Sequence, residues 1–299
     1  MSTPDAKRCG YVALVGAPNA GKSTLLNQLI GAKVSIVSPK VQTTRSRVLG
    51  IVVEGEAQLV FVDTPGIFAP KRRLERAMVA AAWAGTEDAD VVVVLTDASR
   101  DGDTQRIVDG LKSAGRRALL ALNKVDLVSP PQLLPLAERL TKADIFDAVF
   151  MVSGLTGDGV GDLRKHLAAA LPEGPWLYPE DQLTDLPQRL LAAETTREQV
   201  FLQLHQELPY ATMVETDTWE ERDDGSVKIA QTVHVQRDSQ KAIVLGKGGR
   251  QIKEIGARAR AELERVLGRR VHLFLFVRVT EGWTEDRERY TAMGLDFES

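Results

Sequence analysis

Gly16-Ala-Pro-Asn-Ala-Gly-Lys-Ser23 reads G-x-x-x-x-G-K-S, the pattern of a phosphate-binding loop. An apolar run at 11–15 precedes it and is typical of a buried strand, and residues 24–30 read as the start of a helix. This order matters because the loop amides and the positive end of the helix then face the same phosphates. We predict phosphate contacts along the whole segment: Gly16, Ala17, Pro18, Asn19, Ala20, Gly21, Lys22, Ser23 and Thr24.

The identity of the base is not decided by this loop, which serves ATP and GTP alike. Asn123-Lys-Val-Asp126 follows an apolar run at 118–122 that reads as an inner strand of a parallel sheet. The Asp126 carboxylate can accept hydrogen bonds from the ring N–H and the exocyclic amine of guanine, a donor pair that adenine lacks. We expect Lys124 to lie along the base and Asn123 to tie this loop to the phosphate loop.

Two polar segments between these motifs predict a magnesium site. Asp63-Thr-Pro-Gly66 ends an apolar strand, and by itself it reads as a β-turn. Gln42-Thr-Thr-Arg45 by itself reads as a solvated loop. In this order they indicate a GTPase, with magnesium bound by Ser23, Thr44 and Asp63 and the terminal phosphate met by the Gly66 amide. Thr64 and Pro65 are expected beside the nucleotide, and the predicted catalytic residues are Asn19, Lys22, Thr44, Asp63 and Gly66.

Length and composition are those of a globular chain of roughly two domains, with 299 residues and 43% hydrophobic content. A single cysteine, Cys9, excludes an intrachain disulfide and suits a reducing compartment. The four histidines lack metal-ligand spacing, and no stretch resembles a signal peptide or a membrane span. The net charge of −3 does not indicate a nucleic-acid binder, so such a signal has to be local.

Strand and helix patterns alternate up to residue 171, which predicts an α/β domain: a mostly parallel sheet with helices on both faces. We assign residues 1–171 to this GTPase domain and 172–187 to a proline-rich linker. The predicted strands are 46–53, 57–62, 90–95, 117–122 and 148–152 after the first, and the helices are 74–86, 104–113, 131–142 and 160–171.

Residues 188–299 form the second predicted domain, with a C-terminal tail. Its elements are a helix at 188–207, strands at 212–221 and 227–235, helices at 239–245 and 250–267, and a strand at 271–279. The order α-β-β-α-α-β, with Gly246-Lys-Gly-Gly249 between two helices, is that of an α+β KH domain of type II, an RNA-binding module.

The G-x-x-G pattern is common, and by itself it reads as a helix C-cap and turn. Its position between two helices and the basic residues around it favour RNA binding. These basic residues are Lys247, Arg250, Lys253, Arg258, Arg260, Arg265, Arg269 and Arg270. Ile243, Val244 and Ile252 suit an apolar floor for bases, although core packing is the simpler explanation. The predicted RNA contacts are Ile243, Gly246, Lys247, Gly248, Gly249, Arg250 and Lys253.

The chain resembles the Era family of bacterial ribosome-associated GTPases (the TrmE-Era type), nearly end to end. The matching segments are GAPNAGKSTLLNQLIG, QTTR, DTPGI, NKVD, DQLTDLPQRLLAAE, ELPY and VLGKGGRQIKEIGARAR. The resemblance implies binding of GTP and GDP with Mg²⁺, slow hydrolysis, and recognition of the 3′ end of 16S ribosomal RNA during maturation of the small (30S) subunit. It also implies a cytoplasmic protein, peripherally associated with the inner membrane and monomeric in solution.

The resemblance assigns a second base loop to Ser153, Gly154 and Leu155. Gly154 stands where the family usually has alanine, and a backbone amide contact to the guanine carbonyl survives this change. Ile67 stands where Ras-like GTPases have a water-orienting glutamine, so intrinsic hydrolysis is expected to be slow or aided by another group. Asn19 matches an asparagine that related GTPases use to bind K⁺. The alternative is that Asn19 is only a turn residue.

Two classes of function stay open at this point. One is a GTP-switched RNA-binding assembly factor, and the other is a constitutive RNA-binding protein in which the nucleotide is only structural. Hydrolysis that responds to RNA distinguishes the first from the second. An ATP-dependent kinase or helicase conflicts with Asp126, because adenine leaves that carboxylate without a partner.

Overall fold

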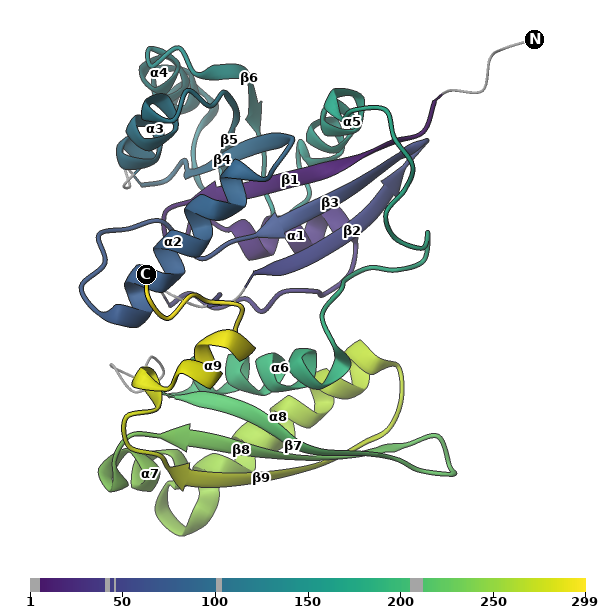
Figure 1. Cartoon of the computed structure of the whole chain (residues 1–299), viewed down its shortest axis with the longest axis vertical. Helices are drawn as coiled ribbons and strands as arrows, with labels where there is room; N and C mark the ends of the chain where they lie inside the picture. The colour runs from purple at the N-terminus through teal and green to yellow at the C-terminus, as the bar shows by residue number, and fades with distance from the viewer. Residues whose placement is uncertain (1–5, 41–43, 46, 101–103, 205–211) are drawn as a thin grey trace. The chain divides into compact units, whose positions relative to one another are not determined.

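The computed structural model describes residues 6–40, 44–45, 47–100, 104–204 and 212–299 (Figure 1). Its contacts divide the chain into two compact units. The first comprises Met1–Ser35, Thr44–Asp185 and Tyr290–Ser299, and the second comprises Ile36–Thr43 and Leu186–Arg289. The predicted domain limits of 1–171, 172–187 and 188–299 follow chain order, whereas these compact units do not.

The first unit is built on a six-stranded sheet with the strand order β2-β3-β1-β4-β5-β6. Only β2 runs antiparallel, against β3, and the other pairings are parallel. The sheet is therefore mostly parallel, as the alternating pattern predicted. The strands are β1 (Arg8–Gly16), β2 (Val48–Glu54), β3 (Ala57–Asp63), β4 (Val91–Asp97), β5 (Ala118–Asn123) and β6 (Phe146–Met151).

Helices cover both faces of this sheet, and each face has its own apolar core. One core contains Leu25 of α1 and Leu163 of α5, and the other contains Ile107 of α3 and Leu140 of α4. The central strands are apolar on both sides because both faces are covered. The helices are α1 (Lys22–Ile30), α2 (Arg73–Glu87), α3 (Thr104–Ser113), α4 (Pro130–Thr141) and α5 (Val160–Ala170), with a 3₁₀ turn, η1 (Val125–Leu127).

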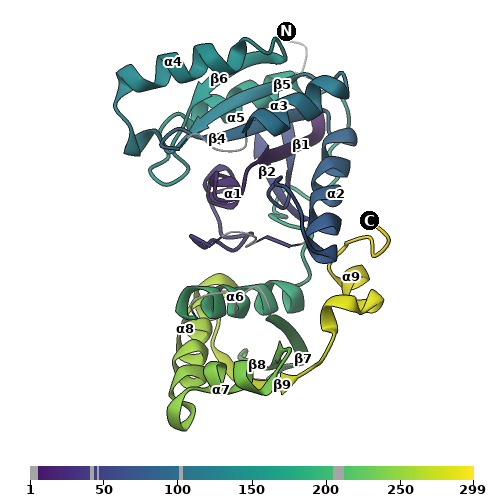
Figure 2. The same cartoon turned by 90° about the vertical axis from the view of Figure 1, so that its left-hand side faces the viewer.

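The second unit is a three-stranded sheet in the order β7-β8-β9, with α6, α7 and α8 on one side of it (Figure 2). β7 is antiparallel to β8, and β8 is parallel to β9. The predicted α-β-β-α-α-β order is confirmed. The elements are α6 (Gln188–Gln203), β7 (Met213–Glu221), β8 (Val227–Val235), α7 (Asp238–Leu245), the turn η3 (Lys247–Gly249), α8 (Arg250–Leu267) and β9 (Val271–Val279).

Most predicted elements agree with the observed bounds to within a few residues. The helix predicted at 188–207 ends at Gln203, and its last predicted residues, 205–207, lie outside the described part of the chain. Two short elements near the C-terminus were not predicted: η4 (Trp283–Glu285) and α9 (Arg287–Ala292).

The proline-rich linker is fastened to the edge of the first sheet. Ile51 of β2 donates its backbone N–H to the carbonyl of Leu183 at 2.8 Å, and Gln58 Nε2 donates to the carbonyl of Tyr178 at 2.7 Å. The Thr184 hydroxyl donates to the carbonyl of Leu49 at 2.7 Å. These bonds satisfy part of the edge that β2 leaves open.

The C-terminal tail packs against α2, the helix that follows Asp63-Thr-Pro-Gly66. Tyr290 and Leu295 are buried in one cluster with Ala77 and Met78 of α2. The Arg73 guanidinium lies 4.5 Å from the centroid of the Phe297 ring. The tail therefore belongs to the compact unit of the GTPase motifs, although it is far from them in sequence.

Candidate functional site: a guanine nucleotide pocket and a basic G-x-x-G loop

The phosphate loop connects the end of β1 to the first residue of α1, as predicted. Two of its residues have positive φ angles, 63° at Asn19 and 91° at Gly21. A Cβ atom at Gly16 would lie 2.7 Å from the carbonyl oxygen of Leu95, so the loop approaches β4 more closely than a side chain allows. The turn that presents the loop amides at the N-terminus of α1 therefore depends on its glycines.

Lys22 lies under this loop, with its ammonium group pointing to the loop carbonyls. Lys22 Nζ donates to the carbonyls of Gly16 at 3.1 Å and Ala17 at 3.2 Å. Burial lowers the pKa of Lys22 to about 8, and the negative charge of Asp63 opposes this shift. A buried cation held at the loop is placed to offset the charge of bound phosphates.

Three hydroxyls converge on the Asp63 carboxylate at the end of β3. Ser23 Oγ and Ser35 Oγ each donate to Asp63 Oδ2 at 2.8 Å, and Ser23 Oγ lies 3.0 Å from Thr44 Oγ1. Ser35 was not predicted, because a lone serine ahead of Gln42-Thr-Thr-Arg45 carries no motif. Burial raises the pKa of Asp63, and the charge of Lys22 and these hydroxyl hydrogen bonds oppose the rise.

The residues around Asp63 fit a magnesium ion. Asp63 is fully buried, and its Oδ1 atom has no hydrogen-bond partner among the described residues. Oxygen atoms from one carboxylate and two hydroxyls are the ligand type that Mg²⁺ takes when water and phosphate complete its shell. Ser23, Thr44 and Asp63 are therefore together, as the sequence predicted, whereas Gln42 and Thr43 lie outside the described residues.

The segment after Asp63 turns beside the phosphate loop. The backbone N–H of Ile67 donates to the carbonyl of Gly16 at 3.1 Å, and a Cβ at Gly66 would lie 2.8 Å from the nitrogen of Pro18. The Thr64 hydroxyl donates to the carbonyl of Leu14, so this side chain holds β1 and does not point to the nucleotide loop. Ile67 is fully buried in the core with Ala13, so it presents no group to water.

A hollow of about 200 Å³ adjoins the phosphate loop at the carboxyl end of β5. Asp126 and Leu155 line it, as predicted for a base site, and Leu127 adds an apolar wall that sequence reasoning missed. Its lining is Gly21, Thr24, Asn123, Lys124, Asp126, Leu127, Gly154 and Leu155. A planar base can lie here between apolar side chains with Asp126 at its polar edge.

Hydrogen bonds hold this hollow against the phosphate loop. Asn123 Nδ2 donates to the carbonyl of Ala20 at 2.8 Å, and Asn123 Oδ1 accepts from the N–H of Gly154 at 2.9 Å. Ser153 Oγ donates to Asp126 Oδ1 at 2.6 Å, which orients the carboxylate. The predicted link through Asn123 is confirmed, and it joins both base loops to the residue before Gly21.

Lys124 has a partner that the sequence did not reveal. Its Nζ atom lies 2.6 Å from Asp97 Oδ2, at the end of the neighbouring strand β4. Burial alone raises the pKa of Asp97, but hydrogen bonds from Lys124 and Ser99 outweigh it and the pKa is lowered. Asp97 therefore stays ionised and fixes the lysine stem beside the hollow.

The G-x-x-G loop has a backbone that suits glycine at three positions. The φ angles are 70° at Gly246, 62° at Gly248 and 76° at Gly249. A Cβ at Gly248 or Gly249 would meet no atom within 4 Å, so the loop surface is open for an approaching ligand. A positive φ in an open loop lets backbone and phosphate approach closely.

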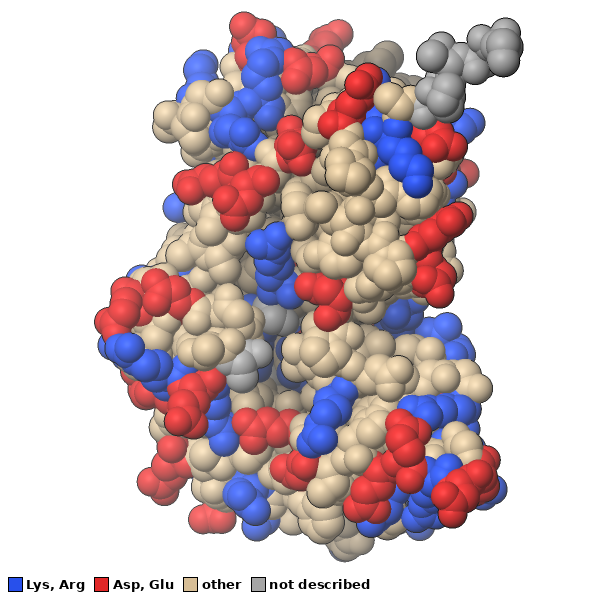
Figure 3. All heavy atoms as spheres, turned by 45° about the vertical axis from the view of Figure 1, so that its right-hand side comes forward, with Lys and Arg blue, Asp and Glu red and all other residues tan. Residues whose placement is uncertain are grey.

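Around this loop the basic side chains divide into two groups. Arg258, Arg265 and Arg269 form ion pairs with glutamates, and these are less available to a ligand. Lys247, Arg250, Lys253, Arg260 and Arg270 are exposed. Basic and acidic side chains are interspersed on the face shown in Figure 3, in keeping with the small net charge.

The three apolar residues near the loop have different roles. Ile243 is 56% exposed, as expected for a base contact, whereas Val244 is fully buried in the core of the sheet and helices. Of the two interpretations that the sequence left open for Val244, core packing is the correct one. Ile252 is partly buried against the same core. The difference arises because successive residues of a helix point in different directions.

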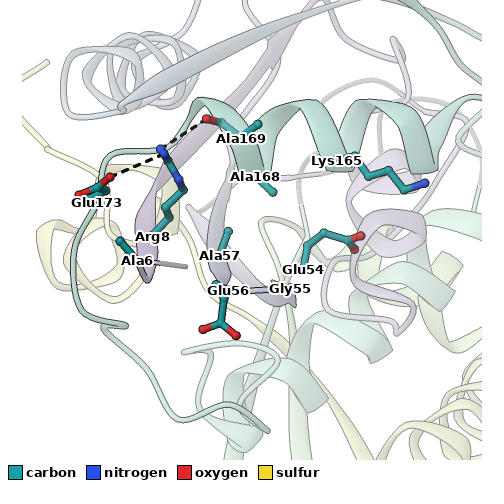
Figure 4. Close-up of a pocket in the computed structure, with 10 residues that line it drawn as sticks. All are labelled: Ala6, Arg8, Glu54, Gly55, Glu56, Ala57, Lys165, Ala168, Ala169 and Glu173. Carbon is teal, nitrogen blue, oxygen red and sulfur yellow. Dashed lines mark hydrogen bonds and ion pairs between the residues drawn. The ribbon is translucent and has the colours of Figure 1, made fainter. Parts of the chain in front are cut away.

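A second hollow of about 440 Å³ lies at the other end of the first sheet (Figure 4). Arg8 points toward Glu173 and the carbonyl of Ala169 there, and Glu54 pairs with Arg164 at 2.5 Å. Arg8, Glu54 and Glu173 thus serve contacts within the fold, and none of the predicted site residues lines this hollow. In the part of the chain that the structure describes, no helix is long and apolar enough to cross a membrane.

Comparison with protein families gives two matches along the chain. Residues 11–124 match the family described as 50S ribosome-binding GTPase, and residues 207–284 match the KH domain family. Several curated relatives are named GTPase Era. The one from Afipia carboxidovorans is 59% identical over 97% of this chain and 95% of its own length. The one from Rhizobium meliloti is 58% identical over 97% and 93%.

Solved structures agree along nearly the whole chain. Aquifex aeolicus Era, in a variant bound to GDP·AlF4⁻, has a TM-score of 0.90 and 40% identity, covering 96% of this chain and 99% of that one. A structure of Era in complex with MgGDPNP and nucleotides 1506–1542 of 16S ribosomal RNA has a TM-score of 0.90 and 41% identity, with the same coverage.

Proposed function

Because this chain belongs to the GTPase Era family, we propose that it is a GTP-hydrolysing switch that binds 16S ribosomal RNA near its 3′ end and assists assembly of the 30S subunit. The observation that carries the nucleotide part is the hollow lined by Asp126, which Asn123 joins to the phosphate loop. The RNA part rests on the KH fold of the second unit and its open G-x-x-G loop.

Each group around the phosphates has a separate task in this proposal. Lys22 offsets negative charge, and the Gly66 amide meets the terminal phosphate. Ser23, Thr44 and Asp63 hold magnesium, which supplies positive charge to the phosphates. Since Ile67 is buried, no side chain at that position orients water, and slow intrinsic hydrolysis is the expected consequence.

Potassium is proposed as an additional cofactor, with Asn19 as its ligand. Asn19 stands in the turn of the phosphate loop, partly buried and with a left-handed backbone at φ 63°. We expect native GTP turnover to be faster in KCl than in NaCl at equal ionic strength, and Asn19→Ala to remove this difference. Phosphate release in the two salts measures it, and equal native rates would contradict a potassium role.

RNA binding is expected to depend on Gly248. Gly248→Asp places a negative charge where the backbone meets phosphates, and each lost charge-assisted contact costs about 1.5–3 kcal/mol, or roughly 10- to 150-fold in affinity. Gly248→Asn is the matched control because it imposes the same strain at φ 62° without the charge. Anisotropy titration with labelled single-stranded RNA should show a much larger loss for aspartate. Native affinity in both variants would leave the loop with no part in binding.

The segment from Ser35 to Thr44 supports coupling between nucleotide and RNA. Ser35 and Thr44, at its two ends, both lie at Asp63. Between them, the backbone N–H of Val37 donates to Glu198 Oε1 of α6 at 2.7 Å, and Lys40 Nζ donates to carbonyls at the C-terminal end of α6. A change at the magnesium site is thereby connected through a few residues to a helix of the KH unit.

The test of the whole proposal is RNA affinity measured with a non-hydrolysable GTP analogue, with GDP and without nucleotide. We expect a difference of about 5- to 150-fold between the first and the last, and RNA must tighten binding of the analogue by the same factor. Lys40→Ala should reduce this factor. Three equal affinities would favour the alternative of a constitutive RNA-binding protein with a structural nucleotide.

The cellular setting proposed from the family is the cytoplasm, with peripheral association at the inner membrane, and a monomer in solution. The small ribosomal subunit is the proposed partner. Cell fractionation, with and without high salt, tests the membrane association, and light scattering of the purified protein tests the monomer.

A further inference from the structure

Strand β9 carries two exposed phenylalanines on the side of the sheet that faces away from α6, α7 and α8. Phe274 is 48% exposed and Phe276 is 59% exposed. Leu273, Leu275 and Val277 alternate with them and pack into the cores under α6 and α8. A Cβ at Gly256 of α8 would lie 3.4 Å from Leu275 Cδ1, which identifies the side that α8 covers. The two rings therefore point away from α6, α7 and α8, whereas α9 reaches the other end of this face, where Arg289 pairs with Glu215 of β7.

The neighbours of the two rings on this open face are small. In the parallel register of β8 and β9, Ala230 stands beside Phe274 and Thr232 beside Phe276. Phenylalanines two residues apart on one strand point to the same side, about 6.6 Å apart along the strand. Because both side chains are exposed, part of each ring is open to a planar group.

Charges on this face favour a polyanion along β9 and not along β7. His272 and Arg278 flank the two phenylalanines on the same side of β9, whereas Glu215, Asp217 and Glu220 follow β7. The edge strand β9 also packs beside α7 and α8, the helices that the G-x-x-G loop connects. The G-x-x-G loop connects helices on one face of the sheet, and the two phenylalanines point to the other face. Both lie at the edge of the sheet formed by β9.

We propose that Phe274 and Phe276 form a stacking platform for unpaired bases of the RNA strand that continues past the G-x-x-G loop. The proposal extends the RNA binding proposed above and rests on it. A KH loop clamps about four nucleotides, so a longer strand needs further contacts. Aromatic side chains on an open sheet face stack two or three bases in RRM domains, and such stacking tolerates any base because every base has a π-face.

The test compares two fluorescein-labelled, unstructured RNAs of about five and about fifteen nucleotides that share one end, titrated into full-length protein. The five-nucleotide RNA fills the loop alone, and the longer one also reaches the platform. We expect Phe274→Ala/Phe276→Ala to weaken binding of the longer RNA by on the order of tenfold or more and to change binding of the shorter one less than about twofold. Thermal unfolding checks that the variant is folded.

Conservative variants separate ring stacking from general apolar contact. Phe276→Trp should keep the affinity for the longer RNA, whereas Phe276→Leu, which keeps an apolar side chain without a ring, should lose it. Leu202→Ala is the matched control, because it removes another exposed apolar side chain of the same unit, 43% exposed on α6. It should bind both RNAs as the native protein does.

The outcomes distinguish this platform from the proposed function. A folded double alanine variant with native affinity for the longer RNA overturns the platform, and so does full affinity in Phe276→Leu. If the double alanine variant binds the longer RNA normally but no longer binds purified 30S subunits, the face is a protein-binding surface. The platform is overturned in that case too. Native protein that binds neither RNA would instead overturn the proposed RNA-binding function, and the platform with it.

Discussion

Replacing Lys22 with alanine is expected to lower GTP turnover by about 10³-fold or more while the protein stays folded. Lys22 is buried at the phosphate loop, and its ammonium group already points at the carbonyls of Gly16 and Ala17. A cation held there by the fold needs no rearrangement to offset charge that develops on the phosphates. Such preorganised electrostatic contacts are commonly the largest single contribution to catalysis.

Single-turnover phosphate release measures this effect, and circular dichroism checks the fold. Lys165→Ala is the matched control, since Lys165 is an exposed lysine of α5 that lines the hollow at the other end of the sheet. It should turn over GTP at the native rate. Substantial turnover in purified Lys22→Ala protein would show that the loop is not the site of hydrolysis.

The second large effect is expected at Asp126, where asparagine should weaken GTP binding by roughly 10²- to 10⁴-fold and shift preference toward xanthosine triphosphate. Xanthine carries a ring carbonyl where guanine has its exocyclic amine, so it can accept a hydrogen bond from the asparagine amide. Ser153 Oγ, 2.6 Å from Asp126 Oδ1, holds the side chain at the edge of the hollow in the required orientation.

Competition of GTP, XTP and ATP against a labelled guanine nucleotide measures this preference. Ser153→Ala is the informative companion variant, because it removes the orienting hydroxyl but keeps the carboxylate. We expect it to weaken GTP binding modestly and to leave the base preference unchanged. Native protein with equal affinity for ATP and GTP would be incompatible with Asp126 as the base-reading residue.

Most of the nucleotide site could be predicted from local motifs, because the chemistry of these motifs depends on residues that are neighbours in sequence. A loop that needs positive φ at Gly21 and a cation one residue later can be recognised from its letters. The same holds for the G-x-x-G loop and for the alternation that predicted a mostly parallel sheet. Parallel strands that end in polar motifs bring those motifs to one edge, so the meeting of Ser23 with Asp63 followed from topology.

Other parts of the site were invisible in the sequence because their partners are distant and carry no pattern. Ser35 donates a hydrogen bond to Asp63, and Asp97 pairs with Lys124, only because strands and loops pack together. A serine or an aspartate in a polar loop has many possible partners, and local propensity does not choose among them. The pairs form because the fold brings Ser35 next to the buried carboxylate of Asp63 and Asp97 next to the ammonium group of Lys124.

The sequence by itself thus determined the order of elements, the nucleotide and the kind of RNA module, since these depend on short-range backbone requirements and on periodicity. Only the tertiary structure decided which apolar side chains are covered. It buried Val244 beside exposed Ile243, packed Tyr290 on α2, and left Phe274 and Phe276 open. The physical reason is that a strand or helix specifies two faces, but burial depends on what other elements pack against each face.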